Sequence, residues 1–299
     1  MAANYATAAV GTETSGSILS PSSQNSLFGL KPTIGLLSRS GIVPISSTLD
    51  TPGPMTRNSI DNAILLSAMV GRDEADIATN DAPTDKDYIR AIENTSLSNK
   101  RFGYFKPMLE DSIFSATVEK IKSTGASVIG LEPIEVDFSF FRAFLYGDMI
   151  KDLPSYMDTY ASENITQRTV KDFYEYNAED TLLRVPYGQQ LFEGMVNDTM
   201  TTERHAEIKK DYLSQGQRFF ETHITEHNLD AIISINNYNA GHAAMAQYPC
   251  LATPMGYKAS GEPINLTFIG RSFEEDKLLG FAAAWEKAFP VRQPPVAYK

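Results

Sequence analysis

The stretch that decides the fold runs from residue 11 to residue 63 and reads GTETSGSILSPSSQNSLFGLKPTIGLLSRSGIVPISSTLDTPGPMTRNSIDNA. The segment that leads into it, YATAAVG at residues 5–11, has small and β-branched side chains, which predicts a tightly covered central strand. Residues 12–26 are rich in Gly, Ser and Thr and form a loop. Beyond them, the spacing of Pro and Gly predicts short strands and tight turns close to a core.

Strands and helices alternate along the rest of the chain. The predicted elements are a helix capped by Asn58 or Ser59 and closed by Gly71, a strand at 101–105, a helix at 114–123, strands at 126–136 and 230–235, and an amphipathic helix that ends at Pro290. This alternation is typical of an α/β sheet. Without an internal repeat or a long linker, the chain is predicted to form a single domain over 1–299, with a helical insertion at about 139–228.

Composition narrows the classes of function. The formal charge of −11 and the lack of a basic run argue against nucleic acid and anionic membranes as partners. No apolar stretch approaches the roughly 18 residues that span a bilayer. The single cysteine, Cys250, cannot form an internal disulfide, which favours a reducing compartment. We therefore expect a cytoplasmic globular protein.

The chemically suggestive segment is GTETSGSILSP at residues 11–21. A strand that ends in a turn of small residues lets a substrate approach closely and leaves several backbone N–H groups for an oxyanion. Ser17 sits in that position as a candidate nucleophile. The plain alternative is a connecting Gly/Ser loop, which is common, and the pattern alone favours it.

A longer match favours the functional interpretation of this loop over the plain one. Residues 11–63 resemble the signature of the amidase-signature family, written around GTDTGGSIR-P-A…G-KPT-G…D--GP--R, and residues 248–286 resemble the end of that family's sequences. The resemblance implies an α/β/α fold with a mixed central sheet covered by helices. It places the nucleophile at Ser17 and the oxyanion donors at the N–H groups of Thr14, Ser15, Gly16 and Ser17.

The same resemblance implies a Ser–cis-Ser–Lys triad, and its lysine and cis-serine precede the strand predicted at 5–11. We therefore expect that upstream sequence is missing and that these 299 residues alone are nearly inactive, because losing a general base costs about 10²- to 10⁴-fold in rate. Lys31 matches a structural position of the family's GLKPT element, so it is not assigned the catalytic role. An unpaired strand edge also predicts association between molecules.

The chain differs from the family signature at two positions, and four other residues are expected to support the active site. Ser15 replaces the usual first glycine, which is tolerated where φ is not strongly positive. Leu19 replaces an arginine common in relatives, so it cannot form an ion pair with Glu13, and this weakens carboxylate-bearing substrates as a prediction. The residues expected to support the active site from behind are Thr12, Glu13, Asp50 and Arg57, the last two being otherwise an ordinary surface ion pair.

Other chemistries are predicted less strongly. His242 is the best placed base for a serine–histidine mechanism, although a lone histidine among Gly and Ala is more often a packed residue. His223 and His227 lie four residues apart but lack an HExxH pattern, so we expect a solvated helix end and no metal. Cys250, flanked by apolar residues and prolines, is expected to be a buried, inert thiol. No phosphate-binding loop is present and no cofactor is implied.

The function implied by the resemblance is hydrolysis of a carboxamide through an acyl-enzyme on Ser17, with release of ammonia or an amine. The alternatives are the A subunit of a glutamyl-tRNA amidotransferase and a non-catalytic fragment or binding protein. Within the helical insertion, residues 171–193 (KDFYEYNAEDTLLRVPYGQQLFE) resemble stand-alone amidases, including peptide amidases, and are expected to line the pocket entrance. These aromatic helices could equally complete the core.

Overall fold

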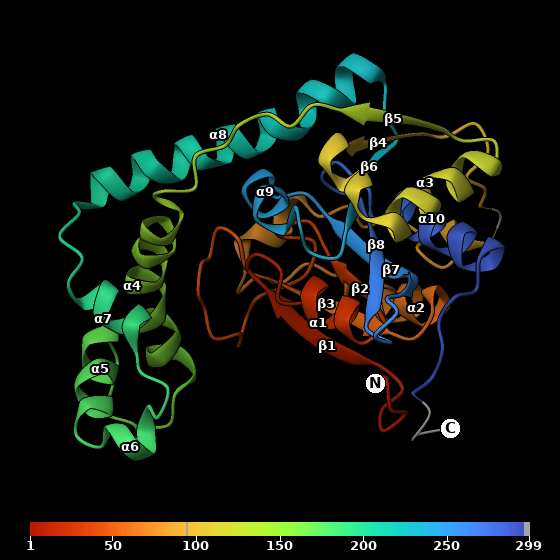
Figure 1. Cartoon of the computed structure of the whole chain (residues 1–299). Helices are drawn as coiled ribbons and strands as arrows, with labels where there is room; N and C mark the ends of the chain where they lie inside the picture. Colours follow the sequence, from red (N-terminus) through yellow and green to blue (C-terminus); the bar gives the residue numbers. More distant parts are fainter. Residues whose placement is uncertain (94, 296–299) are drawn as a thin grey trace. The chain divides into compact units, whose positions relative to one another are not determined.

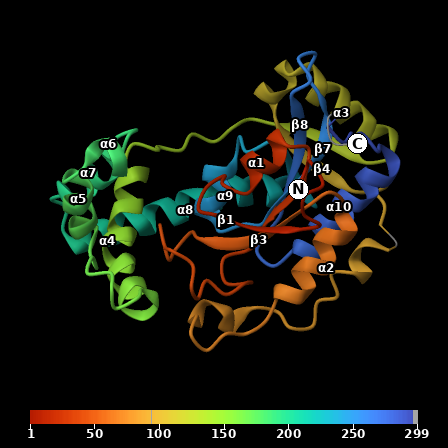
Figure 2. The same cartoon turned by 90° about the horizontal axis from the view of Figure 1, so that it is seen from below.

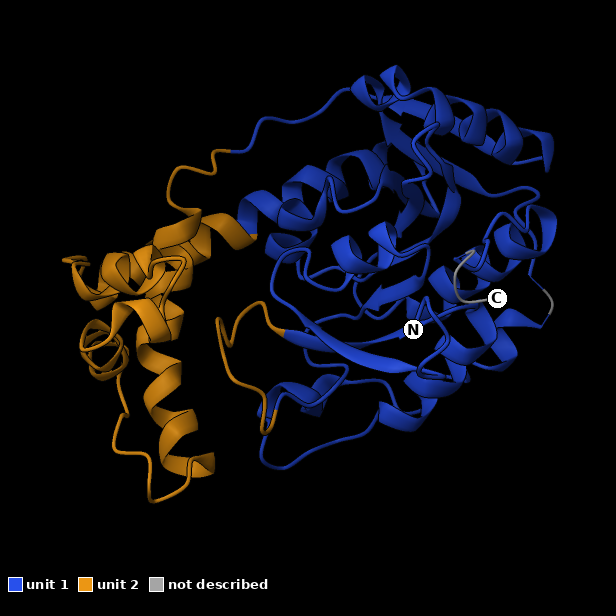
Figure 3. Ribbon diagram, turned by 60° about the horizontal axis from the view of Figure 1, so that its bottom comes forward, with its two compact units in different colours: residues 1–39, 51–136, 214–299 blue, residues 40–50, 137–213 orange. Residues whose placement is uncertain are grey.

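The computed structural model describes residues 1–93 and 95–295. The chain divides into two compact units, which Figure 3 distinguishes by colour. The first unit comprises residues 1–39, 51–136 and 214–299, and it contains the sheet. The second comprises residues 40–50 and 137–213 and is helical. We describe each unit by itself.

One mixed sheet of eight strands forms the centre of the first unit, within the described residues (Figure 1). Its order is β1-β3-β2-β7-β8-β6-β4-β5. Strand β4 runs parallel to β5 and to β6, and the other neighbours are antiparallel. The strands are β1 Ala9–Glu13, β2 Phe28–Lys31, β3 Thr51–Thr56, β4 Arg101–Phe105, β5 Ser127–Leu131, β6 Ala231–Ile235, β7 Cys250–Tyr257 and β8 Pro263–Ile269.

Helices cover both faces of this sheet, as Figures 1 and 2 show. The helices of the first unit are α1 Leu19–Gln24, α2 Ser59–Met69, α3 Ser112–Ser123, the last part of α8 Thr202–His227, α9 Ala240–Ala246 and α10 Glu275–Ala288, with short 3₁₀ turns at Ile77–Asp81, Arg90–Ile92 and Lys106–Glu110. Side chains alternate along each strand, so that Leu251 of β7 enters one core while Cys250 and Ala252 enter the other. The predicted α/β/α fold with a mixed sheet is confirmed.

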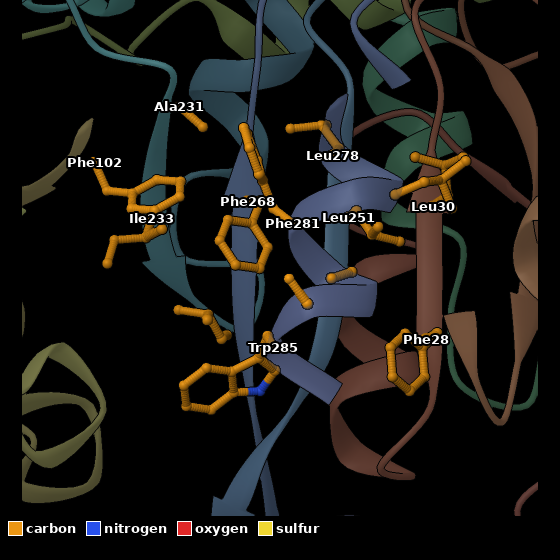
Figure 4. Close-up of a cluster of buried hydrophobic side chains, with 14 of the residues drawn as sticks. Phe28, Leu30, Phe102, Ala231, Ile233, Leu251, Phe268, Leu278, Phe281 and Trp285 are labelled. Carbon is orange, nitrogen blue, oxygen red and sulfur yellow. The ribbon is translucent and has the colours of Figure 1, made fainter. Parts of the chain in front are cut away.

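The larger core lies between the sheet and α2, α3 and α10, and Figure 4 shows part of it. Phe102 packs edge-on against Phe281, with ring centroids 5.2 Å apart, and also contacts Phe268 at 5.7 Å. Trp285 is fully buried, and its indole N–H donates to the Pro254 carbonyl at 2.9 Å. Because a buried tryptophan N–H needs an acceptor, this bond fixes α10 against β7.

Several predicted elements are confirmed. Asn58 caps α2 by accepting the Asp61 N–H, and the strand–helix–strand unit forms with β4 parallel to β5. The helix before Pro290 is α10, which ends at Ala288.

The strand predicted at 5–11 forms slightly later in the chain, as β1, Ala9–Glu13. Among the described residues it lies at the end of the sheet, with β3 as its strand neighbour. Tyr5 is 83% exposed and Val10 is 55% exposed, so the described residues do not cover this strand. Gly11 lies opposite Gly53 in the β1–β3 ladder. Association through the outer edge of β1 stays a prediction.

The second unit has its own small core. Its helices are α4 Phe141–Tyr160, α5 Val170–Ala178, α6 Thr181–Arg184, α7 Gln190–Val196 and the first part of α8 Thr202–His227. Their buried centre consists of Leu153, Met157, Val170 and Met195. The loop at residues 40–50 is bound to α4, because the Ser46 hydroxyl donates to Asp148 at 2.5 Å and the Ser47 N–H donates to Asp152 at 2.7 Å.

Asp148 is almost fully buried and also pairs with Lys209 of α8. One carboxylate therefore joins the loop, α4 and α8. Across the described part of the chain, no helix combines the length and the apolar character needed to cross a membrane.

Replacing Gly53 by alanine is expected to lower the free energy of unfolding by about 3 kcal/mol, since overpacking forces the backbone to shift. A Cβ there would lie 2.0 Å from the Leu30 carbonyl oxygen and 2.9 Å from Pro32 Cδ. Gly71→Ala is the matched control, because a Cβ there meets no described atom within 4 Å, and it should change stability by less than about 0.5 kcal/mol. Urea unfolding measures both variants, and equal midpoints would contradict the close approach.

Candidate active site

Ser17 lies in the turn that joins β1 to α1. Strand β1 ends at Glu13 and Ile18 is the N-cap of α1, so residues 14–17 make the whole connection. Ser17 is exposed, whereas Thr14 and Gly16 on the same turn are buried. The turn therefore presents one hydroxyl to the outside on a backbone that is held from within.

A buried carboxylate holds this backbone. Glu13 is 1% exposed, and its Oε2 accepts the N–H of Ile18 at 2.8 Å and that of Leu19 at 2.9 Å. These N–H groups open α1 and have no carbonyl partner within the helix, so the carboxylate satisfies donors that would otherwise be buried unpaired. The sequence predicted Glu13 as a support for the active site, and the structure provides it with two backbone partners in the Ser17 turn.

Burial dominates the ionisation of Glu13. Desolvation raises the pKa of Glu13, and the positive charge of Lys31 together with backbone N–H groups partly opposes the rise. Lys31, on β2, is itself fully buried and its ammonium donates to the Pro32 carbonyl at 3.2 Å. The cation that opposes the desolvation of Glu13 is thus Lys31.

The backbone conformation at position 16 and the small space around it both require glycine. Its φ of +123° lies in the region that side chains rarely adopt, and a Cβ there would come within 3.2 Å of the Asn237 amide nitrogen. Asn237 belongs to the turn between β6 and α9. It is not among the site residues predicted from the sequence. The signal that could have pointed to it is the run Asn-Asn-Tyr-Asn directly after a buried strand.

Ser15 and the backbone N–H groups of the predicted oxyanion turn follow Glu13 directly in the chain. Ser15 is not among the residues with positive φ, so its Cβ is accommodated. The Gly16 N–H lowers the pKa of Glu13. It does not reach hydrogen-bond geometry with Glu13 Oε1, which has no hydrogen-bond partner among the described residues. The N–H groups of Ile18 and Leu19 donate to Glu13. The N–H groups of Thr14, Ser15, Gly16 and Ser17 stay the predicted oxyanion donors.

The other predicted supports are Thr12, Arg57 and Asp50. Thr12 is exposed on β1 opposite Pro52. Arg57 donates to the Ala6 carbonyl at 2.7 Å and so secures the segment before β1. Asp50 belongs to the second unit, where its carboxylate accepts the Ile45 and Ser46 N–H groups, each at 2.7 Å.

Of the alternative acid–base residues, His242 is partly buried and Cys250 is fully buried. His242 of α9 stacks on Phe219 with centroids 4.1 Å apart, and desolvation lowers the pKa of His242 to about 4. Burial raises the pKa of the Cys250 thiol to about 12, as expected for an inert thiol.

The second unit contains an apolar pocket of about 470 Å³. Part of its wall comes from α4, including Leu145 and Met149, and part from the segment resembling stand-alone amidases, including Val185 and Leu191. Other residues of the same segment, among them Phe173 and Phe192, pack against the core of that unit. That the segment lines the entrance to a substrate pocket stays a prediction.

Comparison with known proteins agrees with this geometry. The Amidase family model matches residues 1–238. An Arabidopsis thaliana protein named as a probable amidase is 32% identical over 98% of this chain and 59% of its own length. The crystal structure of an amidase family protein from Bacillus anthracis superposes with a TM-score of 0.92 at 31% identity, covering 98% of this chain and 59% of that one. Native peptide amidase from Stenotrophomonas maltophilia gives 0.89 at 30% identity, covering 98% and 64%. The chain spans about three fifths of the length of these relatives.

Glu13→Ala is expected to lower the free energy of unfolding by about 2 kcal/mol, because it leaves two buried N–H groups without an acceptor. Glu13→Gln retains an oxygen acceptor and should cost less. The two variants are compared by urea unfolding, and an equal loss in both would contradict the hydrogen-bonding role.

The pH dependence of the stability of Glu13→Gln, compared with the wild type, tests the ionisation of Glu13. Because burial raises the pKa of Glu13, the folded state holds this proton more tightly than the unfolded chain. The stability contributed by protonated Glu13 is present below the unfolded pKa of about 4.3 and is lost as pH rises through the folded pKa. Stability of the wild type relative to Glu13→Gln should therefore fall above about pH 4, whereas exposed Glu163→Gln should follow the wild type at every pH.

Proposed function

Because this chain belongs to the amidase family, we propose that Ser17 is the nucleophile of a carboxamide hydrolase. The observation that carries the proposal is an exposed serine on a turn of fixed backbone, whose buried side is held by the Glu13 carboxylate. Such a turn presents a hydroxyl and several N–H groups to the same substrate carbonyl.

The reaction proceeds in two steps. Ser17 Oγ loses its proton to a base and attacks the amide carbon, and the resulting oxyanion accepts hydrogen bonds from the N–H groups of residues 14–17. Collapse of this intermediate breaks the C–N bond. The leaving nitrogen takes the proton back from the base and departs as ammonia or an amine, and the acyl group remains as an ester on Ser17. Water then hydrolyses the ester to a carboxylate and frees the serine.

The base is proposed to be the family's lysine, acting through the cis-serine. Both belong to the part of the family's fold that lies outside these 299 residues, since the chain spans about three fifths of its relatives. His242 is a poor substitute, because a base with a pKa of about 4 holds a proton weakly at neutral pH.

The apolar pocket of the helical unit is proposed to receive an apolar group of the amide substrate. Its wall includes Val185, Gln189 and Leu191 from the segment that resembles peptide amidases. We favour a stand-alone amidase over an amidotransferase subunit for this reason. Small-molecule amides with a bulky apolar side chain are the substrates expected.

Labelling with a fluorophosphonate tests the nucleophile. The chain alone should react at least about 100-fold more slowly than the chain fused to the upstream portion of a related amidase, because the activating base is then present. Ser17→Ala should abolish labelling of the fusion. Ser15→Ala is the matched control and should retain it, since Ser15 is proposed to act through its N–H. Labelling that persists in Ser17→Ala would refute the assignment.

Changing a pocket residue tests the substrate class in the same active fusion. Leu145→Glu places a charge in the apolar pocket and should raise KM about tenfold or more for amides with bulky apolar groups, with little change for acetamide. Leu182→Glu is the control, because Leu182 is 89% exposed and does not line the pocket. A KM change of equal size for both substrates would contradict a role in recognising apolar groups.

A further inference from the structure

We infer that the last turns of α8 bind a divalent transition-metal ion, for which Zn²⁺ is the best fit, through His223, Glu226 and His227. The donor atoms of these three side chains all lie within 4.8 Å of one another. Residues three and four positions apart share one face of a helix, so a single ion can reach all three. The site is separate from the Ser17 turn and does not depend on the proposed function.

The burial of His223 is the second observation that indicates a ligand. The sequence predicted a solvated helix end, but His223 is only 8% exposed and packs edge-on against Phe105, with centroids 5.8 Å apart. Neither ring nitrogen has a hydrogen-bond partner among the described residues. Buried polar groups of this kind are rare, because leaving them unpaired costs free energy. A bound ion would satisfy the nitrogen that faces Glu226 and His227.

The backbone of Glu132 lies beside the His223 ring. Its carbonyl does not reach hydrogen-bond geometry with either ring nitrogen, and it would accept the N–H of the nitrogen that does not bind the ion.

The donor set selects the metal. Two imidazoles and one carboxylate suit Zn²⁺ and its neighbours Co²⁺, Ni²⁺ and Cu²⁺, whereas Mg²⁺ and Ca²⁺ require oxygen ligands. Tetrahedral Zn²⁺ with bonds of about 2.0–2.1 Å separates its donors by about 3.3 Å. Glu226 is exposed and His227 is half-buried, so both can rotate toward the fixed His223 ring. Three protein ligands leave the fourth position to water.

The backbone around the site is well held. The two histidine rings are nearly parallel, at 9°, with centroids 6.4 Å apart. Arg101 Nε donates to the His227 carbonyl at 3.1 Å, and the Leu229 N–H closes the helix on the Ile224 carbonyl at 2.9 Å. The site also lies at the C-terminal end of a 26-residue helix, where the partial negative charge favours a cation.

Titration of the untagged 299-residue chain with ZnCl₂, followed by calorimetry, tests the site. We expect one ion per chain and micromolar affinity or better, and CoCl₂ should give the visible absorption bands of tetrahedral Co²⁺. His227→Ala and Glu226→Gln change side chains that are not buried, so both should fold, as circular dichroism will verify. Each should weaken Zn²⁺ binding by about tenfold or more.

Glu207→Gln is the matched control, because this exposed carboxylate on the same helix pairs with Arg204 away from the site. It should bind Zn²⁺ as the wild type does. The inference is overturned if the wild type shows no saturable binding, or if His227→Ala and Glu226→Gln bind as tightly as Glu207→Gln.

Discussion

The carboxylate of Glu13, buried between β1 and α1, is the constraint on which the Ser17 turn depends. By accepting the N–H groups of Ile18 and Leu19 it closes the start of α1 against the end of β1. Without it, the four residues that join the strand to the helix would leave these donors unpaired in the interior. The exposed position of Ser17 follows from this interaction on the inner side of the turn.

Burying that carboxylate requires compensation from elsewhere in the fold. Lys31 is fully buried and lowers the pKa both of Glu13 and of Glu275, whose own pKa desolvation raises. Glu275 in turn accepts the Thr33 N–H at 2.6 Å, which joins the segment after β2 to the start of α10. One buried cation thus partly opposes the desolvation of two buried carboxyl groups, and it links the serine turn electrostatically to the C-terminal helix.

Local signals in the sequence predicted much of this structure, and non-local pairings account for what was missed. The Asn58 cap and the strand–helix–strand unit depend on neighbouring residues, so pattern alone locates them. The contact between Gly16 and Asn237, by contrast, arises only when β6 enters the same sheet. In the same way, the loop at residues 40–50 forms a unit with residues 137–213 through Ser46 and Asp148, which no periodicity reveals.

Desolvation also explains why the first unit offers Ser17 so little acid–base chemistry of its own. Burial raises the pKa of Glu13 and of Cys250 and lowers that of His242, in each case favouring the neutral form. A base with a pKa of about 4 is protonated in about one molecule in a thousand at pH 7, so it would be a weak acceptor for a serine proton. Glu13 thus supports the turn through its hydrogen bonds, and the proposed base remains a lysine acting through a second serine.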